Sequence, residues 1–290
     1  MKDISILIPT YNYVCCQLVE QLEAQASALG IAHEIIVADD GSTDSSCVAA
    51  NRSIRSLPHC RLLECSDNRG RAAVRNFLSR QAQYEWVLFV DSDMVVVRND
   101  FIRRYAETAE GDIVDGGVQI AKVTRGNLRA IYEQASMKEH TPDKRQKSPY
   151  RDFHTANFLA RRDILLQWPF DERLRRYGYE DVLFGKMMEM QKVTINHIDN
   201  PLSFEVFESN TDFMGKTEEG LQTLCAFREE LNGYSRLLEH ANRIPRFPVR
   251  LWHQLFAGLE RRTLTGRHPS LAVFNLYKLG YLVTLLSKKP

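Results

Sequence analysis

Hydrophobic residues in the first 120 positions form short runs that alternate with longer amphipathic stretches. The apolar, often β-branched runs lie at 4–8, 34–38, 61–65, 86–90 and 112–117. The stretches between them have a helical period and lie at 14–29, 43–56, 70–82 and 99–109. Strands and helices that alternate at this spacing predict βαβ units, and therefore an α/β fold with a mainly parallel central sheet flanked by helices.

Beyond position 117 the alternation becomes less regular. The later elements expected from the pattern are a helix at 124–140, a strand leading into a helix at 156–168, and helices at 177–190 and 211–240. Residues 141–153 form a charged loop with prolines, a kind of segment that often covers a pocket. We expect the α/β part to end near residue 205 and a helical, basic extension to occupy 206–290.

Polar, turn-forming residues follow each of the first four predicted strands. They are the segments 9–12, 39–44, 67–71 and 91–93. Because the carboxyl ends of parallel strands meet at one edge of a sheet, these segments should lie close together. The sequence therefore predicts a ligand site at this edge.

Asp91, Ser92 and Asp93 interrupt an otherwise apolar segment, "FVDSDMVVV". A buried carboxylate without a partner is costly, so the two aspartates need a cation or water. Oxygen ligands at a strand end suit Mg²⁺ or Mn²⁺, and a divalent ion there would neutralise a diphosphate leaving group. The alternative, a solvated turn, fits poorly with apolar residues on both sides.

The segment "DDGSTD" at 39–44 is open to two interpretations. A turn followed by a helix cap explains residues 41–44, with glycine for the positive φ and a hydroxyl or carboxylate as the cap. It does not explain why both Asp39 and Asp40 are acidic. One of these carboxylates could accept a hydrogen bond from the N–H edge of a nucleobase.

Three arginines lie in the segment "NRGRAAVRN" at 68–76. They could be ordinary surface charge on a helix. If phosphates bind at this edge, Arg69 or Arg71 should face them, and spacing alone does not choose between the two. Arg75 would then brace the loop.

Glu180 and Asp181 begin a predicted helix, where the helix dipole stabilises negative charge. Neighbouring side chains on a helix point about 100° apart, so they can do different tasks. One could take the proton from an attacking hydroxyl while the other holds the acceptor. Ordinary charge at a helix start is the alternative. Among the histidines, only His197, at a probable strand end, is a metal-ligand candidate.

Charge is unevenly distributed along the 290 residues. The whole chain has a net charge of +1, but residues 236–290 contain ten Lys and Arg against two acidic residues. This basic end suggests contact with an anionic surface, and nothing indicates a nucleic-acid partner. The apolar segment 271–286 is shorter than the ~20 residues of a spanning helix, so it either lies on a membrane or packs in the core.

The six cysteines have no zinc-binding spacing, and the first residues form a strand pattern rather than a signal peptide. Reduced thiols and no signal peptide are typical of a cytoplasmic protein. With the basic end, they suggest a cytoplasmic location, with contact to the inner face of the cell membrane through 236–290.

Five motifs in register resemble family 2 glycosyltransferases of the GT-A fold. They are "IPTYN" at 8–12, "DDGSTD" at 39–44, "NRG" with "RN" at 68–76, "DSD" at 91–93 and "ED" at 180–181, in matching order over residues 3–200. The segment that begins "DNPLSFEVFESN" at 199 further resembles a bacterial branch of the family.

The resemblance implies an inverting transferase that moves a sugar from a nucleotide-diphospho-sugar, with a UDP-sugar favoured, to a hydroxyl of a glycan or lipid-linked acceptor in polysaccharide biosynthesis. It implies a nucleotide-sugar-binding half at 1–117 and an acceptor-binding half at 118–205. The implied donor residues are Pro9, Thr10, Tyr11, Asn12, Asp39, Asp40, Arg69, Arg71, Asp91 and Ser92. Asp93 would bind Mn²⁺ or Mg²⁺ and Asp181 would be the base. Glu180, Asn157 and Tyr179 would hold the acceptor.

One position departs from the branch. A histidine, a plausible third metal ligand, is expected three residues after the "NP" pair, and this chain has Phe204 there. His197 or water would then complete the metal shell, or the metal is weakly bound. Two other classes of protein compete with a glycosyltransferase. One is a non-catalytic relative that binds nucleotide-sugars, and the other is a sugar nucleotidyltransferase. The second is disfavoured because "IPTYNYVCC" lacks the glycine-rich loop of that class.

Overall fold

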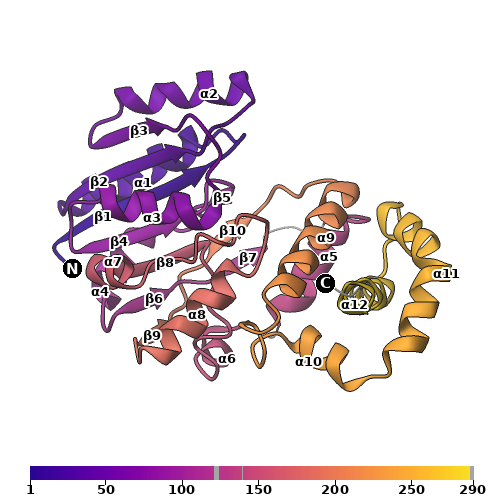
Figure 1. The fold of residues 1–290 in the computed structure, drawn as a ribbon. Helices are drawn as coiled ribbons and strands as arrows, with labels where there is room; N and C mark the ends of the chain where they lie inside the picture. Colours follow the sequence, from indigo (N-terminus) through magenta and orange to yellow (C-terminus); the bar gives the residue numbers. More distant parts are fainter. Residues whose placement is uncertain (121–123, 139, 288–290) are drawn as a thin grey trace.

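A computed structural model describes residues 1–120, 124–138 and 140–287, and its centre is a seven-stranded sheet (Figure 1). The strand order is β3-β2-β1-β4-β8-β6-β9. In chain order these strands are β1 (Asp3–Thr10), β2 (Ala32–Asp39), β3 (Cys60–Glu64), β4 (Trp86–Val90), β6 (Ile113–Asp115), β8 (Asn157–Arg161) and β9 (Ile195–His197). The five strands expected from the first 120 residues are confirmed.

Six of the seven strands run in the same direction, and β6 pairs in parallel with β9. β1 lies between β2 and β4 and is parallel to both, and β2 is parallel to β3. β8 runs antiparallel between β4 and β6, so the sheet is mixed rather than uniformly parallel. All residues of β4 after Trp86 are buried, which matches the continuous apolar run that predicted it.

Helices cover both faces of the sheet and divide the core into two apolar clusters. One face carries α1 (Cys16–Leu29), α4 (Phe101–Thr108) and the short α2 (Ser45–Asn51) with the 3₁₀ helix η1 (Arg52–Ser56). The other carries α3 (Arg71–Gln81), α7 (Arg162–Gln167) and α8 (Glu180–Met190). Alternate residues of β1 point into opposite clusters, Ile6 into the first and Leu7 into the second, as the period of a strand requires.

A second, three-stranded sheet was not anticipated. It contains β5 (Met94–Val95), β7 (Val118–Ile120) and β10 (Leu202–Phe204), in the order β5-β10-β7. Each strand has only two or three residues, too few for a recognisable alternation of apolar and polar positions. This sheet places Phe204 opposite Met94, next to Asp93.

The helices beyond the second sheet pack together beside it. They are α9 (Asn210–Ala226), α10 (Arg236–Arg243), α11 (Arg246–Thr265) and α12 (Leu271–Ser287), with α5 (Leu128–Met137) against them (Figure 1). The single helix expected at 211–240 was wrong, because the chain leaves α9 after Ala226 and starts again at a new cap, Ser235. The expected domain boundary near residue 205 stays a prediction.

The apolar segment 271–286 corresponds to α12, which packs against α9, α10 and α11. Phe274, Tyr277, Leu282 and Val283 are buried there. Of the two alternatives left open for this segment, the structure therefore favours a core helix. No helix among the described residues is long and apolar enough to cross a membrane.

A buried ion pair attaches the segment 141–153 to the sheet. This segment, expected to be a loop, contains the short helix α6 (Pro142–Arg145), whose Arg145 donates to Asp115 at 2.9 Å. Asp115 is fully buried and also accepts the backbone N–H groups of Gly117 and His154. One carboxylate at the end of β6 thus holds three segments.

We predict that Arg145→Ala lowers the free energy of unfolding by about 3–5 kcal/mol, because it leaves the buried Asp115 carboxylate without a cation. Arg161→Ala, which removes an exposed pair with Asp163, is the control and should cost less than about 1 kcal/mol. Urea denaturation of both variants measures the difference. Equal losses would mean that the buried pair has no special role.

Candidate active site

The loops that follow β1 and β2 are joined by hydrogen bonds through Asn12. The Asn12 side-chain oxygen accepts the backbone N–H groups of Thr43 and Asp44 at 2.8 and 2.9 Å. The Asn12 N–H donates to Ser42 Oγ at 2.7 Å. Asn12 itself has a positive φ of 50°, a conformation that asparagine tolerates better than most residues. Asn12 therefore holds the loop after β1 against the loop after β2.

Asp40 joins the loop after β2 to the loop after β3. Its two carboxylate oxygens accept the backbone N–H groups of Arg69 and Gly70, each at 3.0 Å. Burial raises the pKa of Asp40, and these two donors oppose that shift. Between the same loops, Gly41 has a φ of 71°, and an added Cβ would lie 2.5 Å from the Asp67 carbonyl carbon. The "DDG" segment therefore closes the loops against one another.

Asp39 lies beneath the loops that Asn12 and Asp40 hold together. Its Oδ1 accepts the Ser42 N–H at 2.8 Å, its side chain is almost completely buried, and it does not line the two cavities described below. The turn interpretation of 39–44 thus explains one oxygen of Asp39, and both oxygens of Asp40 serve the neighbouring loop.

Asp91 is neutralised by a buried arginine. Arg75 Nη2 lies 2.6 Å from Asp91 Oδ1, and the Arg75 side chain is only 2% exposed. Arg75 also donates to the backbone oxygen of Arg71, one helical turn earlier. Arg75 was expected only to brace the loop. In the structure it also supplies the positive charge that compensates the Asp91 carboxylate.

Asp93 is different, because no described side chain forms an ion pair with it. Burial raises the pKa of Asp93, and the neighbouring charge of Asp91 raises it further. Arg71 and Arg129 act in the opposite direction without cancelling the shift. A bound cation would favour the ionised form, so Asp93 fits a metal ligand chemically.

Glu180 and Asp181 begin α8 at an unusual backbone turn. Gly178 and Tyr179 both have positive φ values, 92° and 69°, and this turn aims the start of α8 at the sheet edge. Glu180 is buried and lies 3.4 Å from Arg71 Nη1. Burial raises the pKa of Asp181, and the charge of Glu180 raises it further. A carboxylate with a raised pKa is a better proton acceptor than an ordinary aspartate.

Two cavities adjoin at this edge. One, of about 280 Å³, is lined on its polar side by Asp93, Asp181, Glu180, Arg129, His154 and Lys216. The other, of about 550 Å³, is lined by residues of the strand-end loops, among them Pro9, Thr10, Tyr11, Asn12, Asp40 and Ser92. Arg71, Asp91, Asp93, Tyr177 and Lys216 line both. Together they have the size of a small-molecule site.

The structure distinguishes the two arginines that spacing could not. Arg71 lines both cavities and lies over the Tyr177 ring, with its guanidinium carbon 4.6 Å from the ring centroid. Arg69 instead lies over the Phe77 ring at 4.7 Å and lines neither cavity. A ligand at this edge therefore meets the Arg71 side chain.

Three expected site residues have structural contacts instead. Both ring nitrogens of His197 are engaged, Nδ1 with Arg145 and Nε2 with the Pro149 carbonyl, so His197 is not available to a metal in this structure. Asn157 is buried and lines neither cavity. Its side-chain amide group forms hydrogen bonds with Tyr105, Gly117 and Asn200. Tyr179 packs with the C-terminal helices and lines neither cavity.

Several cavity residues were missed in the sequence, chiefly Arg129, Tyr177 and Lys216. Arg129 lies 36 positions after Asp93, the nearest predicted site residue on its N-terminal side, and belongs to no recognised motif. Its guanidinium lies 5.1 Å from the centroid of the Phe204 ring and is paired with Glu133 and Glu208. Tyr177 lies beside the "GYED" segment, so its proximity was the one available signal.

Comparison with known sequences decides the family. The family described as "Glycosyl transferase family 2" matches residues 5–168, more than half of the chain. The chain belongs to glycosyl transferase family 2.

Three curated relatives of this glycosyl transferase family 2 chain share modest identity with it. An uncharacterized glycosyltransferase of Haemophilus influenzae is 36% identical over 96 residues, 32% of this chain and 37% of that protein. The succinoglycan biosynthesis protein ExoO of Rhizobium meliloti is 32% identical over 123 residues, 42% of this chain and 32% of that protein. The poly(ribitol-phosphate) beta-glucosyltransferase of Bacillus spizizenii is 31% identical over 147 residues, 48% of this chain and 22% of that protein. The chain thus matches less than half the length of each relative.

Solved structures with a similar fold extend over nearly the whole family 2 chain. The mannosyltransferase PcManGT of Pyrobaculum calidifontis, in complex with GDP-Man and Mn²⁺, has a TM-score of 0.57 and 17% identity, covering 99% of this chain and 88% of that one. S. aureus TarS 1-349 in complex with UDP-GlcNAc has a TM-score of 0.52 and 16% identity, covering 97% and 90%. The expected GT-A fold is confirmed.

We predict that Arg75→Met lowers the free energy of unfolding by about 2–4 kcal/mol, because Asp91 then stands beside Asp93 without a cation. Adding Asp91→Asn should restore part of that loss, since the uncompensated charge disappears. A double-mutant cycle of thermal or urea unfolding measures the coupling. Strictly additive losses in the double variant would rule out a direct electrostatic role for Arg75.

Proposed function

We propose that this family 2 chain is an inverting glycosyltransferase that moves a sugar from a nucleotide-diphospho-sugar to an acceptor hydroxyl. The observation that carries the proposal is that Asp93 and Asp181 line one cavity, and that this cavity shares Arg71, Asp91 and Lys216 with the cavity of the strand-end loops. A diphosphate at the shared wall would have its nucleoside on one side and its sugar on the other.

The nucleoside would occupy the larger cavity, between Tyr11 and the loop that Asp40 fixes. Tyr11 is 44% exposed there and offers a ring face against which a base can stack. Asp39 does not line this cavity, and only its second oxygen, which does not accept the Ser42 N–H, would be free for a base. Uracil is the base we test first, and the UDP-GlcNAc and GDP-Man bound by the structural relatives keep both bases in the screen.

The diphosphate would lie near Arg71 and Lys216, which line both cavities. Asp93 would be the protein ligand for a divalent cation, because it has no ion-pair partner among the described side chains, whereas Asp91 is paired with Arg75. Such a cation, when bound, would neutralise the diphosphate and stabilise it as a leaving group. With Phe204 and an engaged His197, the protein supplies few further ligands, and phosphate oxygens and water would complete the shell.

The transfer itself needs a base opposite the leaving group. Asp181 would take the proton from the acceptor hydroxyl as that oxygen bonds to the anomeric carbon and the bond to the diphosphate breaks, which inverts the configuration. Glu180, held by Arg71 at 3.4 Å, would orient the acceptor. Tyr132, Gln119 and Thr155 line the same cavity and are further candidates for acceptor contacts.

The acceptor would be a hydroxyl of a glycan or a lipid-linked glycan, as expected for polysaccharide synthesis on the cytoplasmic face of a membrane. We favour this class because Lys216 of α9, one of the C-terminal helices, lines the smaller cavity.

The experiment that tests the function is a screen of nucleotide-sugars by thermal shift, followed by hydrolysis of the best donor without acceptor. A bound donor raises the melting temperature by mass action. Slow release of nucleoside diphosphate from that donor supports a transferase. Binding without any hydrolysis, with and without Mn²⁺, would favour the non-catalytic relative, which Phe204 keeps as the second candidate.

We predict that Asp93→Ala abolishes transfer and weakens binding of the nucleoside diphosphate in the presence of Mn²⁺, because the cation loses its main protein ligand. Conversely, Phe204→His should tighten Mn²⁺ binding with the nucleoside diphosphate present, measured by titration calorimetry. Phe207→His, on the ring 5.0 Å from Phe204, is the matched control and should change nothing. Full activity of the Asp93→Ala variant would show that Asp93 is not the metal ligand.

We predict that Asp181→Asn leaves donor binding nearly intact while transfer falls by roughly 10²- to 10⁴-fold, the usual contribution of a general base. Because the pKa of Asp181 is raised and the ionised form is the base, wild-type kcat/KM should fall as the pH drops through a value above the ordinary aspartate range of about 3.9. The Asn variant should lack that limb of the profile. Asp163→Asn, in the first turn of α7, is the control. Equal losses of binding and turnover would make Asp181 a structural or donor residue.

A further inference from the structure

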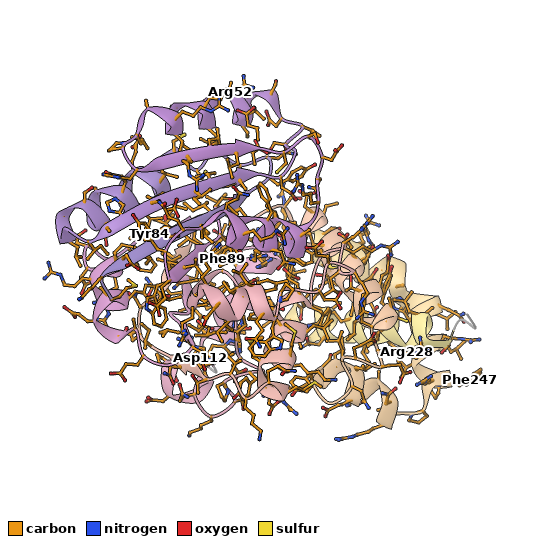
Figure 2. All side chains as sticks on the ribbon, turned by 60° about the vertical axis from the view of Figure 1, so that its left-hand side comes forward. Arg52, Tyr84, Phe89, Asp112, Arg228 and Phe247 are labelled. Carbon is orange, nitrogen blue, oxygen red and sulfur yellow. The ribbon has the colours of Figure 1, made fainter. Side chains whose placement is uncertain are left out.

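The outer side of α11 exposes an apolar face. Phe247, Leu255 and Leu259 are 70%, 68% and 64% exposed, and Leu251, Trp252 and Phe256 are 43%, 45% and 37% exposed. Phe247, Leu251, Leu255 and Leu259 recur every four residues, and Trp252 and Phe256 each directly follow one of them, so the six form one continuous stripe along the helix. Phe247 marks its start at the outer margin of the helical part of the molecule (Figure 2). We call these six residues the α11 stripe.

The opposite side of α11 is covered by the protein. His253, Glu260 and Leu264 are buried, and α11 packs along α12 and α9 (Figure 1). The Trp252 indole N–H donates to Glu260 at 2.8 Å, so the polar edge of this ring is bonded and its remaining surface is apolar. One side of the helix is therefore covered in the structure, and the apolar α11 stripe on its other side is not. Exposed apolar patches of this kind mark interaction surfaces.

The charge around the α11 stripe is mainly positive, and Glu239 of α10 is paired with Arg243. Arg246 and Arg250 are in the first turns of α11, Arg243 ends α10 and Arg262 lies near the other end of α11. The only acidic residue of α11 is Glu260, which is buried on the packed side. An exposed apolar stripe bordered by arginines is the composition of a helix that lies in a membrane interface.

We propose that α11 docks in the plane of an anionic lipid surface, with the α11 stripe in the interface and the arginines at the headgroups. The apolar side chains would be removed from water by the acyl boundary, and the arginines would meet anionic lipid. This assigns membrane contact to α11 rather than to α12, which the sequence had suggested and which is packed inside the bundle.

A second copy of this chain fits the same stripe less well. A two-fold contact through the α11 stripe would bring the flanking arginines of both copies together, with no exposed acidic residue on α11 to compensate. An anionic lipid surface supplies the missing negative charge.

Docking through α11 would also have a defined relation to the cavities. Glu218 of α9 accepts from Arg261 of α11 at 3.0 Å and from Tyr277 of α12 at 2.7 Å. Lys216, two residues before Glu218 on α9, lines both cavities. The packed helices α9, α11 and α12 therefore connect the proposed lipid contact on α11 to the two cavities. This arrangement suits an acceptor that is carried on a lipid. This last point rests on the proposed function; the lipid contact itself does not.

The test is co-sedimentation of the full chain with vesicles of phosphatidylcholine alone, or of phosphatidylcholine with about one third phosphatidylglycerol. Wild type should bind the anionic vesicles, less tightly at high salt, with a blue shift of tryptophan fluorescence that is lost in a Trp252→Phe variant. The triple variant Phe247→Ser, Leu255→Ser, Leu259→Ser should bind at least roughly tenfold more weakly. Arg246→Gln with Arg250→Gln should weaken binding to anionic vesicles by roughly fivefold per arginine.

The matched control is Leu166→Ser, Met190→Ser, Val206→Ser, three comparably exposed apolar residues outside α11 that should leave vesicle binding unchanged. Hydrolysis of the donor without vesicles should be equal in all variants, so a failure of the lipid contact and a failure of the proposed function give different results. No binding of wild type, or binding that survives loss of the α11 stripe, overturns the proposal. So does a wild-type dimer in sedimentation velocity that the triple variant makes monomeric, because the α11 stripe is then a protein interface.

Discussion

The site depends on one electrostatic requirement: every carboxylate delivered to the sheet edge needs a compensating group. Arg75 compensates Asp91, two backbone N–H groups compensate Asp40, and Arg145 compensates Asp115. Each of these pairs also connects two segments, so the neutralisation of charge and the assembly of the loops are the same event. A buried pair of this kind is costly to break because the remaining charge stays in the protein.

Asp93 and Asp181 stand apart from this pattern. Burial and a neighbouring carboxylate raise the pKa of each, and no described side chain pairs with either. Carboxylates that the fold leaves uncompensated are candidates for roles with a ligand, because a metal or a substrate proton can complete what the protein omits. The two residues thus separate from the other acids on physical grounds, independent of any family resemblance.

The parts of the fold with a strong apolar period could be predicted from the sequence, and so could the convergence of the strand ends. The three strands of the second sheet could not, because two or three residues carry no period. Asn157 shows a different limit of prediction from sequence. Its strand was predicted correctly, but its side-chain amide group forms hydrogen bonds with Tyr105, Gly117 and Asn200, which are distant in the chain. The choice between Arg69 and Arg71 likewise depended on where Phe77 and Tyr177 lie. For the C-terminal helices, hydrophobicity pointed to α12, yet α12 is apolar because its neighbours surround it. Exposure, which distinguishes α11, is a property of the packing and not of the composition.

The hydrogen bonds of Asp40 have a consequence for how this protein can vary. Its partners are main-chain N–H groups of residues 69 and 70, and Asn12 likewise accepts main-chain N–H groups of residues 43 and 44. Any amino acid except proline presents such a group. The contact between Asp40 and residue 69 is therefore independent of the side chain at position 69, whereas the side chains of Asn12, Asp40 and Asp44, which caps α2, are required for these loops. The link between the two loops therefore places no demand on the residue type at position 69, except that it is not proline.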